Sequence, residues 1–257
     1  DVCTPKAYHI DLDHHLMILE DFGDITASKY LASPTCTQGH EKALFEKAID
    51  IIHNIFYEVG EDESQSIIAP YEDSIYLDEV GLFTNYYYEY IHKEKIDPEL
   101  TIQWSVLWQK QLHHIWPMSP DTLVLRDFHV DNLMILDQGL LGVLDFQDAL
   151  YGSIMYDYIS LVEDARRDMD AGLKAHLQTY FLQIFDPSDH KDLLHAADVL
   201  GALRHAKVLG AFTRYALLKG NKDKLCHLDR TKKYFIDALE RAELKEILHF
   251  TRDLGLL

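Results

Sequence analysis

Apolar residues recur along this chain at two spacings, which separate helices from strands. Three segments place them three or four positions apart, and this predicts amphipathic helices over residues 40–59, 74–93 and 98–115. The second segment is rich in tyrosine and phenylalanine, a stripe that indicates core packing. After residue 148 the pattern is helical to the end, and the predicted helices cover residues 157–169, 176–185, 189–219 and 232–248.

Short apolar runs on either side of turn residues predict two β-hairpins among these helices. The first hairpin pairs residues 6–11 with residues 16–20 across a polar turn. The second pairs residues 133–136 with residues 140–146 across a turn that ends in glycine. A strand over residues 122–125 precedes the second hairpin. Few strands among many helices predict an α+β fold.

Polar residues at the ends of the second hairpin carry the candidate chemistry. Asp127 and Asn132 lie in the loop before its first strand, and Asp145 closes its second strand. Because a hairpin brings these two ends together, we expect the three side chains to converge. Phosphoryl transfer needs a carboxylate that orients the attacking hydroxyl, together with oxygen ligands that hold Mg²⁺ against the phosphates. The sequence therefore predicts Asp127 as the catalytic residue and Asn132 and Asp145 as ligands of Mg²⁺.

The spacing of these residues resembles that of a known superfamily. Arg126-Asp127, followed by four residues and Asn132, is similar to the catalytic loop of protein-kinase-like enzymes, and Asp145-Phe146 is similar to the start of their metal motif. The form RDFHVDN resembles the aminoglycoside and choline phosphotransferase branch. Within that branch LDFQDA, YDYISLVEDARRD and GALRHAKVLGAFTRY resemble the N-acetylmuramate/N-acetylglucosamine anomeric kinases of cell-wall recycling.

The resemblance implies a protein-kinase-like fold and an ATP-dependent reaction. ATP is the implied co-substrate and Mg²⁺ the implied cofactor, and the γ-phosphate is transferred to a small molecule. The implied acceptor is the anomeric hydroxyl of an amino sugar, with an aminoglycoside, choline or homoserine as alternatives.

Further site residues follow from the same resemblance. Backbone groups of Glu20, Asp21 and Phe22 are expected at a hinge that binds adenine. Asp21-Phe22-Gly23 has the same residues as the kinase metal motif, but it lies about a hundred residues before the catalytic loop, whereas the metal aspartate follows that loop. His129 and Asp157 are expected to brace the catalytic loop. His129 would bond a backbone carbonyl or Asp145, and Asp157 would accept backbone N–H groups of the loop. The alternative for Asp157 is an acidic residue that favours a helix N-terminus.

Four other residues are candidates for substrate binding. Glu79 would bond a substrate hydroxyl, because its helix borders the acceptor pocket in related kinases. Asp148 is expected either to contact substrate or to cap the next segment. Arg166 and Arg167 are placed on the helix over residues 157–169, where one of them would reach the sugar. Their alternative is a solvated helix face paired with nearby acidic residues.

The segment before the catalytic loop contains no glycine-rich phosphate loop and no valine-alanine-lysine strand. Residues 1–24 are therefore predicted to be a partial N-terminal lobe with the hinge, and residues 25–257 a helical C-terminal lobe. The chain would be a fragment or one part of a split gene, or it would have lost the strands that cover ATP. The activity of this chain is then in question. The second hypothesis is accordingly an inactive kinase-like remnant that binds a partner or nothing.

Composition narrows the class of partner. The formal net charge of -19 argues against nucleic acid and anionic membranes as partners, and the small-molecule substrate is what the resemblance implies. Three widely spaced cysteines form no disulfide framework, and no apolar run approaches the length of a membrane span. These features predict a cytoplasmic protein and leave its oligomeric state open. A metal hydrolase built on the 15 histidines is disfavoured, because no paired-ligand helix motif is present.

Overall fold

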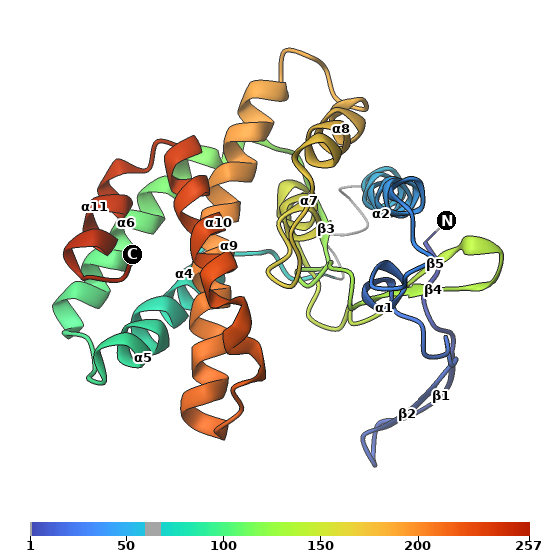
Figure 1. Cartoon of the computed structure of the whole chain (residues 1–257), viewed down its shortest axis with the longest axis horizontal. Coiled ribbons are helices and arrows are strands. Elements are labelled where there is room, and N and C mark those ends of the chain that lie inside the picture. Colours follow the sequence, from blue (N-terminus) through green and yellow to red (C-terminus); the bar gives the residue numbers. More distant parts are fainter. Residues whose placement is uncertain (1, 60–67) are drawn as a thin grey trace.

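The structure is a computed structural model that describes residues 2–59 and 68–257, and most of it is helical (Figure 1). Short antiparallel strands form three two-stranded sheets within the described residues. The predicted α+β fold is confirmed. Among these residues, no helix is both long enough and apolar enough to cross a membrane.

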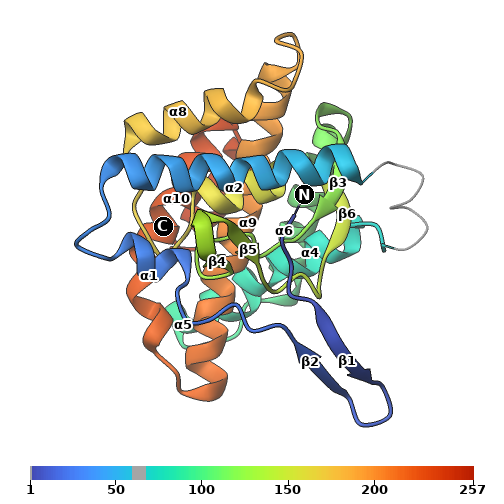
Figure 2. The same ribbon diagram turned by 90° about the vertical axis from the view of Figure 1, so that its right-hand side faces the viewer.

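The first predicted hairpin is confirmed as β1 (Ala7–Asp11) and β2 (Leu16–Leu19), which pair antiparallel. It projects from the rest of the molecule in both ribbon views (Figures 1 and 2). Its apolar side chains are exposed on both sides; Leu12 at the tip is 80% exposed and Tyr8 is 65% exposed. The hairpin is therefore held by its own backbone pairing more than by packing.

Two helices follow the hairpin. The short helix α1 (Ala27–Leu31) was not predicted, because five residues are too few to show a helical period. The predicted long helix is confirmed as α2 (Gln38–Glu58). Thr37 starts it by accepting a hydrogen bond from the backbone N–H of His40, which satisfies a donor that has no partner inside the helix. One face of α2 is buried, as its apolar period predicts.

The aromatic segment forms helix α4 (Asp73–Leu82), a π-helical turn η1 (Phe83–Tyr87) and helix α5 (Tyr88–His92). Tyr76, Phe83 and Tyr87 are buried, which confirms the packing role of the stripe. Helix α6 (Pro98–Ile115) has the predicted bounds, with Asp97 as its N-cap. It ends in a 3-10 turn (Trp116–Met118) that leads into the strands.

Four short strands surround the predicted loop. Strand β4 (Leu133–Ile135) pairs with β5 (Leu141–Val143), which confirms the second hairpin. Strand β3 (Asp121–Val124) pairs with β6 (Leu150–Ser153). The expectation of helix alone after residue 148 is wrong here, because β6 is too short to show an alternating pattern and is fixed by its hydrogen bonds to β3.

The remaining chain contains five α-helices. They are α7 (Met155–Val162), α8 (Ala171–Leu182), α9 (His190–Lys219), α10 (Leu228–Arg241) and α11 (Lys245–Asp253). Between α9 and α10 lies a 3-10 turn η4 (Asp223–His227).

Three of the predicted helices have the wrong bounds. The helix predicted over residues 176–185 is α8, which begins earlier, at Ala171, because the Asp170 side chain caps it by accepting the N–H groups of Gly172 and Leu173. The helix predicted over residues 157–169 ends at Val162, because the Asp164 carboxylate accepts the backbone N–H of Arg166 at 3.0 Å and so replaces helical bonding. The helix predicted over residues 232–248 is two helices. Glu243 takes a left-handed conformation at φ 55°, and the N–H of Leu244 bonds the carbonyl of Leu239, which together end α10.

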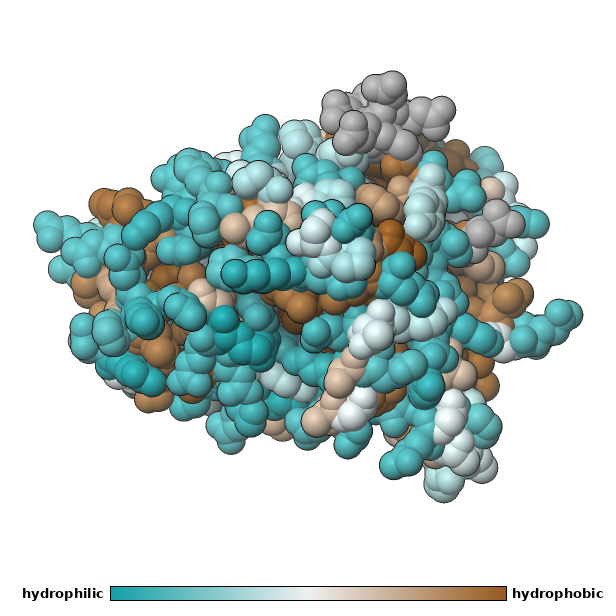
Figure 3. All heavy atoms as spheres, turned by 90° about the horizontal axis from the view of Figure 1, so that it is seen from above, coloured by the Kyte–Doolittle hydropathy of each residue, from teal (hydrophilic) through white to brown (hydrophobic). Residues whose placement is uncertain are grey.

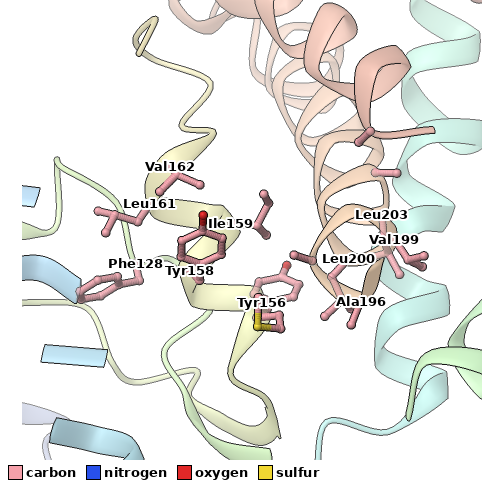
Figure 4. Packing of buried hydrophobic residues seen from close by; sticks show 14 of the residues in the cluster. Phe128, Tyr156, Tyr158, Ile159, Leu161, Val162, Ala196, Val199, Leu200 and Leu203 are labelled. Atoms are coloured by element: carbon pink, nitrogen blue, oxygen red, sulfur yellow. The ribbon is translucent and has the colours of Figure 1, made fainter. Parts of the chain in front are cut away.

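Helices α7 and α9 form the centre of the core. Every residue of α7 is buried, and α9 packs against α4, α7, α10 and η1. Figure 4 shows Tyr156 and Ile159 on the side of α7 that faces α9. A Cβ atom at Gly201 of α9 would lie 3.0 Å from the Ile159 side chain, so the two helices are in close contact there. Figure 3 shows one face of the exterior, on which polar side chains predominate and apolar side chains lie mainly between them.

Gly210 allows α9 to approach the chain between α4 and η1 closely. A Cβ atom at this position would lie 2.6 Å from the backbone nitrogen of Phe83 and closer still to the carbonyl group of Leu82. The neighbouring atoms belong to backbone and cannot rotate away. Glycine is therefore required here by packing.

We expect Gly210→Ala to lower the free energy of unfolding by at least about 1–3 kcal/mol, because the added methyl group forces helices apart in a packed core. Urea denaturation measures the change. Gly39→Ala is the control, since a Cβ at Gly39 meets only the Thr37 hydroxyl at 3.7 Å. A Gly210→Ala protein as stable as wild type would show that α9 does not need this close approach.

Candidate active site

The three residues predicted to act together, Asp127, Asn132 and Asp145, line one pocket of about 490 Å³. Asp127 and Asn132 come from the loop before β4, and Asp145 follows β5. The opposite wall is formed by α9 and the chain after it. The pocket therefore brings two carboxylates and an amide together beside a helical surface.

Hydrogen bonds within the loop fix the position of Asn132. Its side-chain amide nitrogen donates to the backbone carbonyl of Asp127 at 3.0 Å. Its backbone carbonyl accepts from the N–H of Leu144 at 2.9 Å. The second bond ties the loop to the segment between the end of β5 and Asp145. With the amide nitrogen engaged, the side-chain oxygen is the atom of Asn132 that can serve as a metal ligand.

This donor set suits magnesium better than a transition metal. Amide and carboxylate oxygens are hard ligands of the type that Mg²⁺ prefers, with phosphate oxygens and water completing its coordination. Among the described residues, no group of three His, Cys, Asp or Glu side chains is arranged to hold a metal ion.

Two non-glycine residues of the site have backbone conformations that L-residues rarely adopt. Arg126 has φ 69° and Asp145 has φ 59°. Aspartate tolerates this left-handed region, whereas arginine persists there only when surrounding contacts hold it. Arg126 immediately precedes Asp127, and Asp145 itself lines the pocket. The unusual backbone conformations therefore occur where they set the direction of the two pocket carboxylates.

Asp157 supplies one of the contacts that hold Arg126. Its carboxylate accepts the backbone N–H of Leu125 at 2.6 Å and that of Arg126 at 2.9 Å, which is the geometry expected from the sequence. Burial raises the pKa of Asp157 to about 7, against the opposing effects of these two N–H donors and the Arg204 guanidinium. Asp157 lies at the start of α7, so it joins the loop to the core.

Glu79 holds Arg126 from the other side. This buried carboxylate pairs with the Arg126 guanidinium and with the Lys207 ammonium at 2.8 Å. It also accepts hydrogen bonds from the hydroxyls of Tyr71 at 2.7 Å and Tyr156 at 3.1 Å. Burial acts to raise the pKa of Glu79, but Lys207 and Arg126 hold it below its ordinary value.

The role predicted for Glu79, a hydrogen bond to a substrate hydroxyl, stays a prediction. Glu79 is not among the residues lining the pocket, and its oxygens are taken by the four partners just described. Sequence reasoning placed it at the acceptor pocket because its helix was expected to border that pocket. The partners that turn it inward come from α7, α9 and two loops, which the sequence does not align.

Asp127 has a positive environment despite the acidity of the whole chain. Desolvation by the pocket walls acts to raise its pKa, but the cations of Lys207 and Arg204 hold the pKa of this carboxyl below its ordinary value. Asp127 is therefore ionised at neutral pH. An ionised carboxylate in this place can accept the hydrogen of an attacking hydroxyl.

His129 is buried behind Asp127 and lines the same pocket. Burial and the Arg166 cation lower its pKa to about 4, so it is neutral at physiological pH. The expected hydrogen bond from its ring to a carbonyl or to Asp145 is not formed within the described residues, where its Nδ1 atom has no partner. The backbone of His129 bonds within the loop: its N–H donates to the carbonyl of Asp127 at 3.0 Å, and its carbonyl accepts from the N–H of Asn132 at 2.9 Å. A bracing role for its ring stays a prediction.

The twin arginines separate in the structure. Arg166 lines the pocket and pairs with Asp131 at 2.8 Å and Asp164 at 3.0 Å. Arg167 pairs with Glu41 on α2 at 2.6 Å and lies outside the pocket lining. Both follow the end of α7, so their predicted place on a helix is wrong, and so are their predicted helical partners.

Asp148 and the predicted hinge lie outside this pocket. Asp148 is exposed, and its backbone carbonyl accepts from the Arg126 guanidinium at 3.2 Å. The N–H of Glu20 bonds the carbonyl of Lys6 at 2.8 Å, and Asp21 accepts from the N–H of Gly23 at 2.8 Å. Phe22 packs closely on β5. Adenine binding by residues 20–22 stays a prediction.

Sequence reasoning missed the residues that form the helical wall of the pocket. They are Arg204, Lys207, Val208, Ala211, Phe212 and Tyr215 of α9, with Asn221 and Lys224 after it. The signal that was available is their spacing, since positions three and four apart lie on one helix face. Nothing local shows that this face meets the catalytic loop.

Three comparisons with known proteins bear on this site. Residues 76–193, which include Asp127, Asn132 and Asp145, match the phosphotransferase enzyme family. An N-acetylmuramate/N-acetylglucosamine kinase of Neisseria meningitidis serogroup B is 30% identical over 87% of this chain and 66% of that protein. A protein of the same name from Pseudomonas aeruginosa is 29% identical over 96% of this chain and 73% of its own length. The chain thus spans about two thirds to three quarters of these relatives.

Solved structures support the fold. The ADP-bound aminoglycoside phosphotransferase APH(2'')-Ib superposes with a TM-score of 0.56 at 14% identity, covering 91% of this chain and 75% of that one. A choline/ethanolamine kinase family protein from Mesorhizobium loti gives a TM-score of 0.58 at 12% identity, covering 97% and 77%. At these identities the likeness concerns the fold alone.

We expect Asp157→Asn to lower the free energy of unfolding by about 1–3 kcal/mol, because the amide presents one acceptor and one donor to two buried N–H groups. Chemical denaturation measures the loss, and Asp253→Asn, at an exposed position, is the control. Equal stability of the two variants would mean that Asp157 does not hold the loop.

Glu79→Gln is expected to destabilise the fold by about 3 kcal/mol or more, because it leaves Arg126 and Lys207 without their shared buried anion. The exposed Glu72→Gln, at the N-cap of the same helix, is the matched control and is expected to be near neutral. Thermal and urea unfolding compare the two. If Glu79→Gln and Glu72→Gln lose equally little stability, the ion pairs of Glu79 with Arg126 and Lys207 do not stabilise the fold.

Proposed function

The chain belongs to the phosphotransferase enzyme family, and from that premise we propose that it is an ATP-dependent kinase of an amino sugar. The proposed acceptor is the anomeric hydroxyl of N-acetylmuramate or N-acetylglucosamine, the sugars in the names of the relatives. The observation that carries the proposal is the meeting of Asp127, Asn132 and Asp145 around one pocket. A pocket of about 490 Å³ is of a size that holds a monosaccharide.

Asp127 would orient the attacking sugar hydroxyl and accept its hydrogen. Its pKa is held down by Lys207 and Arg204 against the effect of desolvation, so the carboxylate is ionised when the sugar binds. In phosphoryl transfer most of the acceleration comes from positioning and charge stabilisation. The clamp on Arg126 serves that positioning, because it fixes the residue immediately before Asp127.

Asn132 and Asp145 would hold Mg²⁺ through one amide oxygen and one carboxylate. Bound there, the ion would neutralise charge on the phosphates of ATP. Residues 1–24 are proposed as part of an N-terminal lobe, with the backbone of Glu20, Asp21 and Phe22 at the adenine. We further propose a cytoplasmic location, because the reaction draws on ATP.

The test is phosphate transfer from ATP to N-acetylmuramate and N-acetylglucosamine by the purified chain, with and without Mg²⁺. We expect Asp127→Ala to lower kcat by about 10²–10⁴-fold, the usual contribution of a positioned base. Asp137→Ala, in the exposed turn of the same hairpin, is the control and is expected to keep wild-type activity. Chelation of Mg²⁺ is expected to abolish transfer.

Two outcomes would count against the proposal. One is undiminished transfer by Asp127→Ala. The other is no transfer by the wild-type chain to amino sugars, aminoglycosides, choline or homoserine, which would leave the inactive kinase-like remnant as the better account.

A further inference from the structure

Arg204 is a buried arginine whose side chain has no hydrogen-bonding partner among the described residues. It is 3% exposed, it lies on α9, and it lines the pocket beside Asp127. Its Nη1 atom is fully buried and bonds no acceptor in the described part of the chain. A guanidinium carries five N–H donors and stays charged at any physiological pH, so burial without an acceptor is unfavourable.

The carboxylates around Arg204 are engaged elsewhere. Asp157 accepts the backbone N–H groups of Leu125 and Arg126, and one oxygen of Asp164 accepts from Arg166. The Arg204 charge acts to lower the pKa of Asp127 and Asp164 and opposes the rise that burial causes in the pKa of Asp157, so Arg204 lies near all three without a hydrogen bond to any of them. The three carboxylates therefore offset the charge of Arg204, but none of them accepts a hydrogen bond from its Nη1 atom.

The other cations of the pocket are arranged differently. Arg166 pairs with Asp131 and Asp164, and Lys207 pairs with Glu79. Lys224 is exposed to solvent. Of the cations lining the pocket in the described chain, Arg204 is the one that is buried and makes no ion pair. Half-buried Arg166 also has an Nε atom without a hydrogen bond, but that atom is ion-paired with Asp131. The unpartnered Nδ1 atom of buried His129 lines the same pocket.

We propose that Arg204 binds an oxyanion on the acceptor side of the pocket, a role that rests on the kinase function proposed above. The planar guanidinium fork matches the two oxygens of a carboxylate or of a phosphoryl group. Two groups in the proposed reaction carry such oxygens. One is a carboxylate on the acceptor, and the other is the phosphoryl group in transfer near Asp127.

The two proposed acceptors separate these sources. N-acetylmuramate carries a lactyl ether with a carboxylate, whereas N-acetylglucosamine has a hydroxyl at that carbon and no negative charge. A residue that reads the carboxylate discriminates between them. A residue that stabilises the phosphoryl group acts equally on both.

The experiment measures the binding of each sugar to the nucleotide-free chain by calorimetry, and then kcat and KM with ATP and Mg²⁺. The variants are Arg204→Gln, which removes the charge, and Arg204→Lys, which keeps the charge without the fork. Arg214→Gln is the matched control, because Arg214 lies on the same helix, is exposed and packs on the Tyr86 ring.

If Arg204 reads the carboxylate, Arg204→Gln weakens N-acetylmuramate binding by about 10- to 100-fold and leaves N-acetylglucosamine unchanged. If it contacts the phosphoryl group, kcat falls by a similar factor for both sugars while their binding is unchanged. Arg204→Lys is expected to restore part of either loss. Both patterns support the oxyanion site.

The proposal is overturned if Arg204→Gln has wild-type binding and kcat for both sugars, or if it lowers only the unfolding temperature. Arg204 would then be a structural counter-ion for Asp157 and Asp164. Should Arg204→Gln fail to fold, Arg204→Lys gives the same comparison. Because sugar binding needs no catalysis, an N-acetylmuramate affinity that depends on Arg204 in a chain without kinase activity would defeat the proposed function and keep the anion site.

Discussion

The backbone at Leu125 and Arg126 is held between two buried carboxylates, and the site depends on this clamp. Asp157 binds the two N–H groups, and Glu79 binds the Arg126 guanidinium. Both carboxylates are shielded from water, where hydrogen bonds to charged groups are strong and their loss is costly. The clamp keeps Arg126 in its left-handed conformation and so determines where Asp127 points.

The clamp exists because three helices meet behind the loop. Asp157 comes from α7, Glu79 from α4, and Lys207, the other cation on Glu79, from α9. Glycine at position 210 lets α9 lie directly on the chain at the end of α4. Core packing and site geometry are therefore coupled. A shift of α9 would remove Lys207 from Glu79 and would also remove the α9 side chains that line the pocket.

Charge is distributed unevenly in this acidic protein. The chain carries a formal net charge of -19, yet Arg166, Arg204 and Lys207 gather at one pocket. Lys207 is paired with the buried carboxylate of Glu79, whereas Arg204 adds a positive charge that the nearby acids do not hydrogen-bond. A site with this local balance attracts anionic groups in spite of the overall field. Of the proposed ligands, ATP and N-acetylmuramate are anionic, whereas N-acetylglucosamine is not.

The sequence by itself determined the helices with a clear apolar period, the two hairpins and the grouping of Asp127, Asn132 and Asp145, because periodicity and loop spacing are local properties. Tertiary structure alone decided that β6 pairs with β3, that Glu79 turns inward and that Arg204 faces the pocket. Those outcomes depend on elements far apart in the chain meeting in the core. A charged side chain takes the partner that packing brings to it, and no local pattern encodes that choice.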